Sequence, residues 1–215
     1  MTVSQTISNK YISPWFLHES KKREELARFF LHNSSKRSQN SPIYKTALRN
    51  LCDVEIKSII GYEGKRALRH GNVSLLLKNT LEAISVTMQP HGKNLNYRID
   101  ERAYYMSVDC RLLQLCITKI ISKCFERQIT LNVQVKTSTS QLAIVVETKG
   151  FIKDRQTLSL LKSVLHLHKG TLVVTNNRIA FSFNSRLPNQ AGEFEPPSID
   201  ELIHDPVSYI NIALA

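Results

Sequence analysis

The chain has 215 residues, and its 29 lysines and arginines outnumber 18 acidic residues, giving a formal net charge of +11. Hydrophobic residues make up 42% of the chain, which excludes wholesale disorder. The sequence contains no run of about 18 apolar residues and no charged-then-apolar start typical of a secretory signal, so we expect a cytoplasmic protein without a membrane segment.

Charge is distributed unevenly along the chain. Residues 1–71 carry 13 basic and 6 acidic residues, whereas residues 189–215 carry five acids and no lysine or arginine. A basic body could bind nucleic acid, an anionic membrane or an acidic protein. Alternatively, the charge serves solubility only, and the acidic tail folds back on the basic body.

The first 71 residues are predicted to form a helical hairpin. No glycine or proline interrupts the stretch from Trp15 to about Ser38, which predicts one long helix. At the break that follows, Ser41 suits an N-cap and Pro42 the first helical position, so a second helix is expected from Ile43 to about Tyr62. One hairpin leaves an apolar stripe uncovered, and pairing of two copies as a four-helix bundle would cover it. We therefore expect a homodimer.

Residues 72–188 are predicted to form an α/β sandwich with its helices on one face, because one helix and two strands alternate three times. The expected helices are Leu75–Met88, Asp109–Arg127 and Asp154–His168. The expected strands are Leu95–Ile99, Tyr104–Val108, Ile129–Val135, Leu142–Val146, Leu172–Val174 and Ile179–Phe183. Residues 189–215, which contain three prolines, read as an extended acidic tail with one short helix near Ile199–Ile203. The fold class is thus α+β.

This order of elements resembles the cytoplasmic core of sensor histidine kinases, in which a dimerising helix pair precedes an ATP-binding domain of the Bergerat type. Three segments carry the resemblance, which covers most of residues 15–188: Val108–Gln114, Val145–Ile152 and Leu161–Leu172. They look like the start of the family's asparagine-bearing helix, its Asp-x-Gly-x-Gly turn, and the last helix with its His-Gly-Gly ending.

Departures from the family pattern predict that ATP binding has been lost. The two helix asparagines, the second of which holds Mg²⁺ in active members, fall at Lys119 and Lys123, and an ammonium group has no lone pair to offer a metal. The aspartate that reads adenine falls at Glu147, and the two glycines fall at Lys149 and Phe151. Few residues remain for the family's lid. The two lysines would occupy the magnesium's place or simply lie on a solvated helix edge. We expect no cofactor and no ATP-dependent kinase activity.

Histidine phosphotransfer is the chemistry that would remain, because imidazole forms a phosphoramidate of high transfer potential. His18, followed by Glu19 on the first helix, echoes the family's phosphoacceptor and is the candidate catalytic residue, with His32 second. Alternatively, His18 has no catalytic role and is an exposed helix residue next to a run of charged residues. The other histidines and the four cysteines show no metal-ligand spacing, so no metal site is expected, and we interpret His166 and His168 as packing or surface residues.

The resemblance implies a degenerate histidine-kinase-like signalling protein, at most a histidine phosphotransferase. It would act as a phosphotransfer or adaptor protein on the receiver domains of response regulators, which are acidic and would dock on the basic first helix. One alternative is a binding protein that sequesters a kinase, a receiver or a transcription factor without phosphoryl transfer. A weaker alternative is a basic nucleic-acid-binding module, although no aromatic residues are interleaved for base stacking.

Overall fold

A computed structural model describes residues 41–61, 68–100, 102–139, 141–149, 155–184, 192–205 and 208–214. The predicted first helix, with His18 and His32, lies outside these residues. The helices are α2 (Pro42–Gly61), α3 (Val73–Met88), α4 (Cys110–Phe125), α5 (Arg155–Leu167), α6 (Ile199–His204) and α7 (Tyr209–Leu214), with a 3-10 turn η2 (Gln89–His91). The strands are β1 (Arg69–Asn72), β2 (Asn94–Ile99), β3 (Tyr105–Val108), β4 (Thr130–Thr137), β5 (Gln141–Glu147), β6 (Thr171–Thr175) and β7 (Arg178–Asn184).

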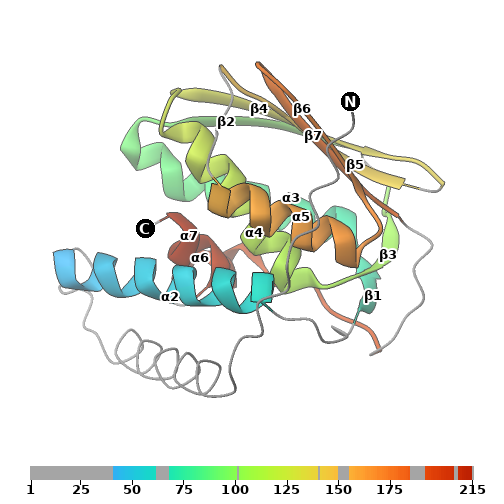
Figure 1. Cartoon of the computed structure of the whole chain (residues 1–215), viewed down its shortest axis with the longest axis horizontal. Coiled ribbons are helices and arrows are strands. Elements are labelled where there is room, and N and C mark those ends of the chain that lie inside the picture. Colours follow the sequence, from blue (N-terminus) through green and yellow to red (C-terminus); the bar gives the residue numbers. More distant parts are fainter. Residues whose placement is uncertain are drawn as a thin grey trace, which may run out of the picture.

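Five strands form one mixed sheet in the order β2-β4-β5-β7-β6 (Figure 1). Strands β2 and β4 are parallel, and the other neighbours in this sheet are antiparallel. All six predicted strands are confirmed, but β3 leaves the main sheet and pairs antiparallel with β1, a strand that the sequence does not predict. The expected hairpin across Asn176 and Asn177 joins β6 to β7.

The helices cover one face of the sheet, as predicted. Along β4, Leu131, Val133 and Val135 are buried, whereas the alternate residues Thr130, Asn132 and Lys136 are exposed. This alternation is typical of a sheet with one core face and one solvated face. Figure 1 shows α3, α4 and α5 side by side on the core face, with α7 and α2 farther from the sheet. The structure is therefore an α/β sandwich with an additional helical layer.

Helix α2 confirms the second helix of the predicted hairpin. The Ser41 side chain accepts a hydrogen bond from the Tyr44 backbone N–H (3.1 Å), and Pro42 is the first helical residue. One face of α2 is apolar and buried, and its residues Tyr44, Leu48 and Leu51 join the core cluster of the α/β sandwich. The helix contacts α5 and α7. The division of the chain at residue 71 and the dimeric bundle remain predictions.

The C-terminal residues correct one expectation, because they are not an extended tail. The short helix predicted near Ile199–Ile203 is confirmed as α6, and its N-cap Ser198 forms a capping box with Glu201. A further helix, α7, packs on α4 and α2 and buries Ile210 and Ile212. Pro196 and Pro197 come before the N-cap of α6, so they leave the backbone hydrogen bonds of that helix intact.

The C-terminal segment also lies against β1. The His70 backbone N–H donates to the Gly192 carbonyl oxygen (2.9 Å), and the Phe194 N–H donates to the His70 carbonyl oxygen (3.0 Å). Residues 192–194 therefore extend the small β1–β3 ribbon. The acidic C-terminal segment does return to the basic body, through these backbone bonds and buried apolar side chains such as Leu202.

Two thiols are enclosed within the core-facing side of α4. Cys116 and Cys124 are buried and unpaired, as expected for packing residues. Burial raises the pKa of both thiols, and that of Cys124 to about 11. Neither is therefore a reactive thiolate near neutral pH.

None of the described helices is long and apolar enough to cross a membrane.

Candidate functional site

Helix α4 begins and runs as its sequence pattern predicts. The Asp109 carboxylate caps the helix by accepting a hydrogen bond from the Leu112 backbone N–H (3.1 Å). Lys119 and Lys123 lie one turn apart on the part of the helix surface that the core leaves half-buried. The Lys123 ammonium lies 2.6 Å from a carboxylate oxygen of Glu126. These are the two positions at which the sequence resemblance places the family's asparagines.

The end of β5 corrects the alignment of the adenine-reading residue. Glu147 is exposed, lies opposite Asn132 in the register, and accepts a hydrogen bond from its side-chain amide (3.1 Å) on the open face of the sheet. Side chains alternate along a strand, so the next residue, Thr148, faces the helices instead. Thr148 is 4% exposed. A site shared with Lys119 and Lys123 would therefore use Thr148, because Glu147 lies across the sheet from them.

The backbone turn after β5 is fastened by a buried glutamine. The Gln128 side chain accepts a hydrogen bond from the Lys149 backbone N–H (2.7 Å) and donates one to the Glu147 carbonyl oxygen (3.3 Å). The Thr148 N–H donates to the Asn177 carbonyl oxygen (2.9 Å), and its side chain is hydrogen-bonded to the Cys124 thiol. These polar groups at the end of β5 are therefore hydrogen-bonded to other groups of the same chain.

The connection between β5 and α5 is short. Strand β5 ends at Glu147 and α5 begins at Arg155, so only residues 148–154 join them. Helix α5 then leads through Lys169 and Gly170 directly into β6. The helix and its ending are confirmed as predicted, and α5 is the one helix among the described residues between β5 and β6.

His168 joins the end of α5 to the start of α4. Its ring is fully buried, packs edge-on against Phe183, and lies with Nδ1 2.7 Å from the Val164 carbonyl oxygen. Nε2 accepts a hydrogen bond from the Asp109 backbone N–H (3.2 Å), which leaves the proton on Nδ1. His166, two residues earlier, is exposed. The interpretation of these two histidines as packing and surface residues is confirmed.

His168 makes stability depend on pH. Burial lowers its pKa, against the smaller opposing effects of the Val164 hydrogen bond and the Asp109 charge. Above the unfolded-state value of about 6.5 both states are neutral, and below it the unfolded state binds a proton that the folded state resists. We therefore expect the free energy of unfolding to fall as the pH drops below about 6.5. Urea unfolding at several pH values should show this fall weakened in His168→Gln. An unchanged pH profile in that variant, like the one expected for the surface control His166→Gln, would contradict this role.

Of the residues that the sequence singles out, Lys119 and Lys123 lie on the helix side of the sheet, whereas Glu147 lies on its open face. The sequence analysis did not single out Thr148, which faces the helices. The candidate phosphoacceptor His18 lies outside the described residues. Within the described ranges, no group of three histidine, cysteine or acidic side chains is arranged to hold a metal ion. The roles of Gln128 and His168 were not predicted, because each depends on contacts between segments distant in sequence.

Comparison with solved structures identifies the architecture. Full-length ShkA in complex with AMPPNP matches with a TM-score of 0.60 at 10% identity, over 83% of this chain and 48% of that one. The Acinetobacter baumannii histidine kinase AdeS matches with a TM-score of 0.51 at 10% identity, over 80% of this chain and 98% of that one. The fold is that of histidine kinases. The chain matches about half of the length of ShkA. No protein-family model and no curated protein sequence matches the chain.

Proposed function

We propose that this histidine-kinase-like chain does not bind ATP and acts in two-component signalling as a phosphotransfer or adaptor protein. Its partners would be the receiver domains of response regulators, and it would work as a homodimer. The histidine-kinase fold supports a role in two-component signalling. The residues at the positions of the family's nucleotide site support the loss of ATP binding. Its location would be the cytoplasm.

The pairing of Lys123 with Glu126 is the observation that carries this proposal. In the family alignment Lys123 replaces the asparagine whose amide oxygen holds Mg²⁺. An ammonium group offers no lone pair, and its positive charge repels a divalent cation. The Glu126 carboxylate, 2.6 Å from the ammonium, is occupied by that contact. These residues do not fit a magnesium-bound triphosphate.

The strand end supports the same conclusion. Thr148 stands on the helix side in place of an aspartate, and its hydroxyl is hydrogen-bonded to the buried Cys124 thiol. A neutral hydroxyl used in this way cannot reproduce the carboxylate that accepts the adenine amino group. Gln128 holds the backbone on both sides of Thr148, through Glu147 and Lys149. With Thr148 at the aspartate position, the first glycine of the family's turn is present as Gly150, and the second is replaced by Ile152.

A nucleotide titration tests the first half of the proposal. Calorimetry with ATP and Mg²⁺ should show no saturable binding to the full chain, while an active histidine kinase under the same conditions binds. The single variant Lys123→Asn should also fail to bind, because Thr148 and the Gln128 contacts remain. Saturable binding in the micromolar range to the natural chain would overturn this half.

A phosphotransfer assay tests the second half. When a receiver domain carrying labelled aspartyl phosphate is added, we expect acid-labile label to appear on the chain. In this step the bond between phosphorus and the aspartate oxygen breaks, a bond between phosphorus and a ring nitrogen forms, and the aspartate leaves as a carboxylate. The label should disappear in His18→Ala and persist in His32→Ala. Complex formation without label would instead support a binding protein that sequesters its partner.

A further inference from the structure

The main sheet has a free edge at β2, and a groove lies beside it. Strand β2 stands at one end of the strand order, and among the described strands it pairs with β4 alone. The groove has a volume of about 510 Å³ and separates the second half of β2 from the first turns of α3. Its wall includes Leu75 and Lys78 of α3 and Tyr97, Arg98 and Ile99 of β2. It is distinct from the α4 edge and the end of β5 described above.

Every second residue of β2 turns its backbone toward this free edge. The Asn94 N–H donates to the Ile129 carbonyl oxygen (2.8 Å), so Asn94 turns its backbone groups toward β4. Hydrogen-bonding residues alternate along a strand of a parallel pair, so Leu95, Tyr97 and Ile99 turn their N–H and C=O groups outward. No described residue forms a backbone hydrogen bond with these three on the outer side. The edge is therefore a template for one more strand.

The side chains around the groove favour a strand with apolar and acidic residues. Leu75 on α3 is 42% exposed and offers an apolar contact on the helix side. Lys78 and Arg98 are exposed, and neither forms an ion pair with another described residue. Asp100 also lines the groove, but its carboxylate accepts hydrogen bonds from the Thr137 N–H and hydroxyl (both 3.0 Å) at the end of β4. Two basic groups against one acid leave the groove with a net positive charge.

Charge indicates that the occupant is another, acidic molecule. The acidic C-terminal segment of this chain is used elsewhere, since residues 192–194 lie along β1 and Glu201 caps α6. A second copy that paired through its own β2 would bring another Lys78 and Arg98 to the same edge, where like charges repel. The net charge of +11 likewise favours a negatively charged partner over a second copy.

We propose that the free edge of β2 binds an extended acidic segment of another protein, which joins the sheet as a further strand. The backbone of this segment would bond to the outward N–H and C=O groups of β2. Its side chains would alternate, with apolar ones against Leu75 on the helix side and acidic ones near Arg98 on the open face. This inference is independent of phosphotransfer and of the loss of ATP binding.

Matched peptides test charge and backbone pairing separately. The probe is a fluorescently labelled peptide of six residues, the length of β2, in which valine and glutamate alternate. Anisotropy titration with the full chain should show saturable binding of this peptide, and binding weaker by about tenfold or more when lysine replaces glutamate. Absence of saturable binding of the glutamate peptide, or equal binding of the lysine peptide, would overturn the proposal.

Two N-methylated peptides test whether the probe binds as a strand. One carries N-methyl groups on its valines and the other on its glutamates, so each loses the N–H donors of one edge and keeps all side chains. Only alternate residues of an added strand donate to β2, so one of these peptides should lose binding and the other should keep it. Equal binding of the two would mean that no strand is added.

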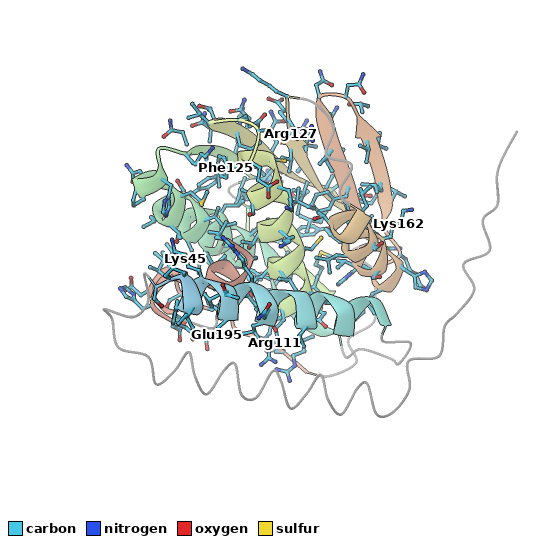
Figure 2. The ribbon with its side chains drawn as sticks, turned by 60° about the vertical axis from the view of Figure 1, so that its left-hand side comes forward. Lys45, Arg111, Phe125, Arg127, Lys162 and Glu195 are labelled. Carbon is cyan, nitrogen blue, oxygen red and sulfur yellow. The ribbon has the colours of Figure 1, made fainter. Side chains whose placement is uncertain are left out.

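Substitutions in the protein locate the site. Arg98→Gln and Lys78→Gln should each weaken binding of the glutamate peptide several-fold, because each removes a positive charge from the groove. Lys162→Gln is the matched control: Lys162 is exposed on α5, which lies across α4 from α3 (Figure 2), so binding should be unchanged. Unchanged affinity in both groove variants, or an equal loss in Lys162→Gln, would place binding elsewhere and overturn the proposal. Sedimentation that shows the peptide dissociating a dimer would assign the edge to a second copy instead.

Discussion

Replacing both Ile210 and Ile212 by alanine is expected to lower the free energy of unfolding by about 4 kcal/mol or more. Each side chain is at most 1% exposed, and truncation of a buried isoleucine costs about 2–5 kcal/mol in lost transfer energy and cavity formation. Helix α7 has only six residues, so it is held by its packing on α4 and α2 rather than by intrinsic helix stability. Urea unfolding followed by circular dichroism measures the effect.

The same substitution on the surface provides the control. Ile43 on α2 is 72% exposed, so Ile43→Ala should change stability by less than about 0.5 kcal/mol. If the double variant is too unstable to fold, the milder Ile212→Val should still cost about 0.5–1.5 kcal/mol. A double variant as stable as Ile43→Ala would mean that α7 does not pack on α4 in solution.

Replacing Gly170 by alanine is expected to be similarly damaging, by about 3 kcal/mol or more. A Cβ atom at this position would overlap the backbone carbonyl oxygen of Ser182 and lie 2.7 Å from a methyl group of Leu165. Ser182 belongs to β7, which pairs with β5 and β6, so its backbone cannot move aside without disturbing the sheet. Chemical denaturation of Gly170→Ala measures the loss.

At Lys169, the residue before Gly170, glycine should be tolerated or should stabilise the protein. Helix α5 ends in a Schellman motif, in which the Gly170 N–H donates to the Leu165 carbonyl oxygen (2.8 Å) and the Lys169 N–H to that of His166 (3.2 Å). Lys169 occupies the left-handed position, with φ +48°. Lys169→Gly should therefore leave stability unchanged or raise it by up to about 1 kcal/mol. A destabilising Lys169→Gly together with a neutral Gly170→Ala would contradict this assignment of the two positions.

Long periodic elements could be predicted from the sequence. Helix α4 was predicted because its apolar residues repeat every three or four positions after the capping Asp109, and β4 because its residues alternate strictly. Strand β1 could not be predicted in this way. Its residues Arg69–Asn72 have little strand propensity, and they are extended because they pair with β3 and contact residues 192–194.

The candidate site was predicted only in part. Lys119 and Lys123 lie on the same side of α4, as their spacing of four residues predicts, because helical spacing fixes which positions share a face. The adenine-reading position was assigned to Glu147, one residue before Thr148. The error arose because β5 is buried on both faces along most of its length, so its sequence shows no polar–apolar alternation: Val145 is buried as well as Ile144 and Val146. A shift of one residue moves a side chain to the other face of the sheet.

The packing of α7 on α4 also affects how this protein is made. Tyr209, the first residue of α7, follows Phe125, the last residue of α4, by 84 positions in the chain. Contacts between such distant segments form late, because a long loop must close first. During synthesis on the ribosome, the apolar surface of α4 that receives Ile210 and Ile212 therefore stays uncovered until nearly all of the described chain has emerged. A chaperone that recognises exposed apolar helices would find its binding site there.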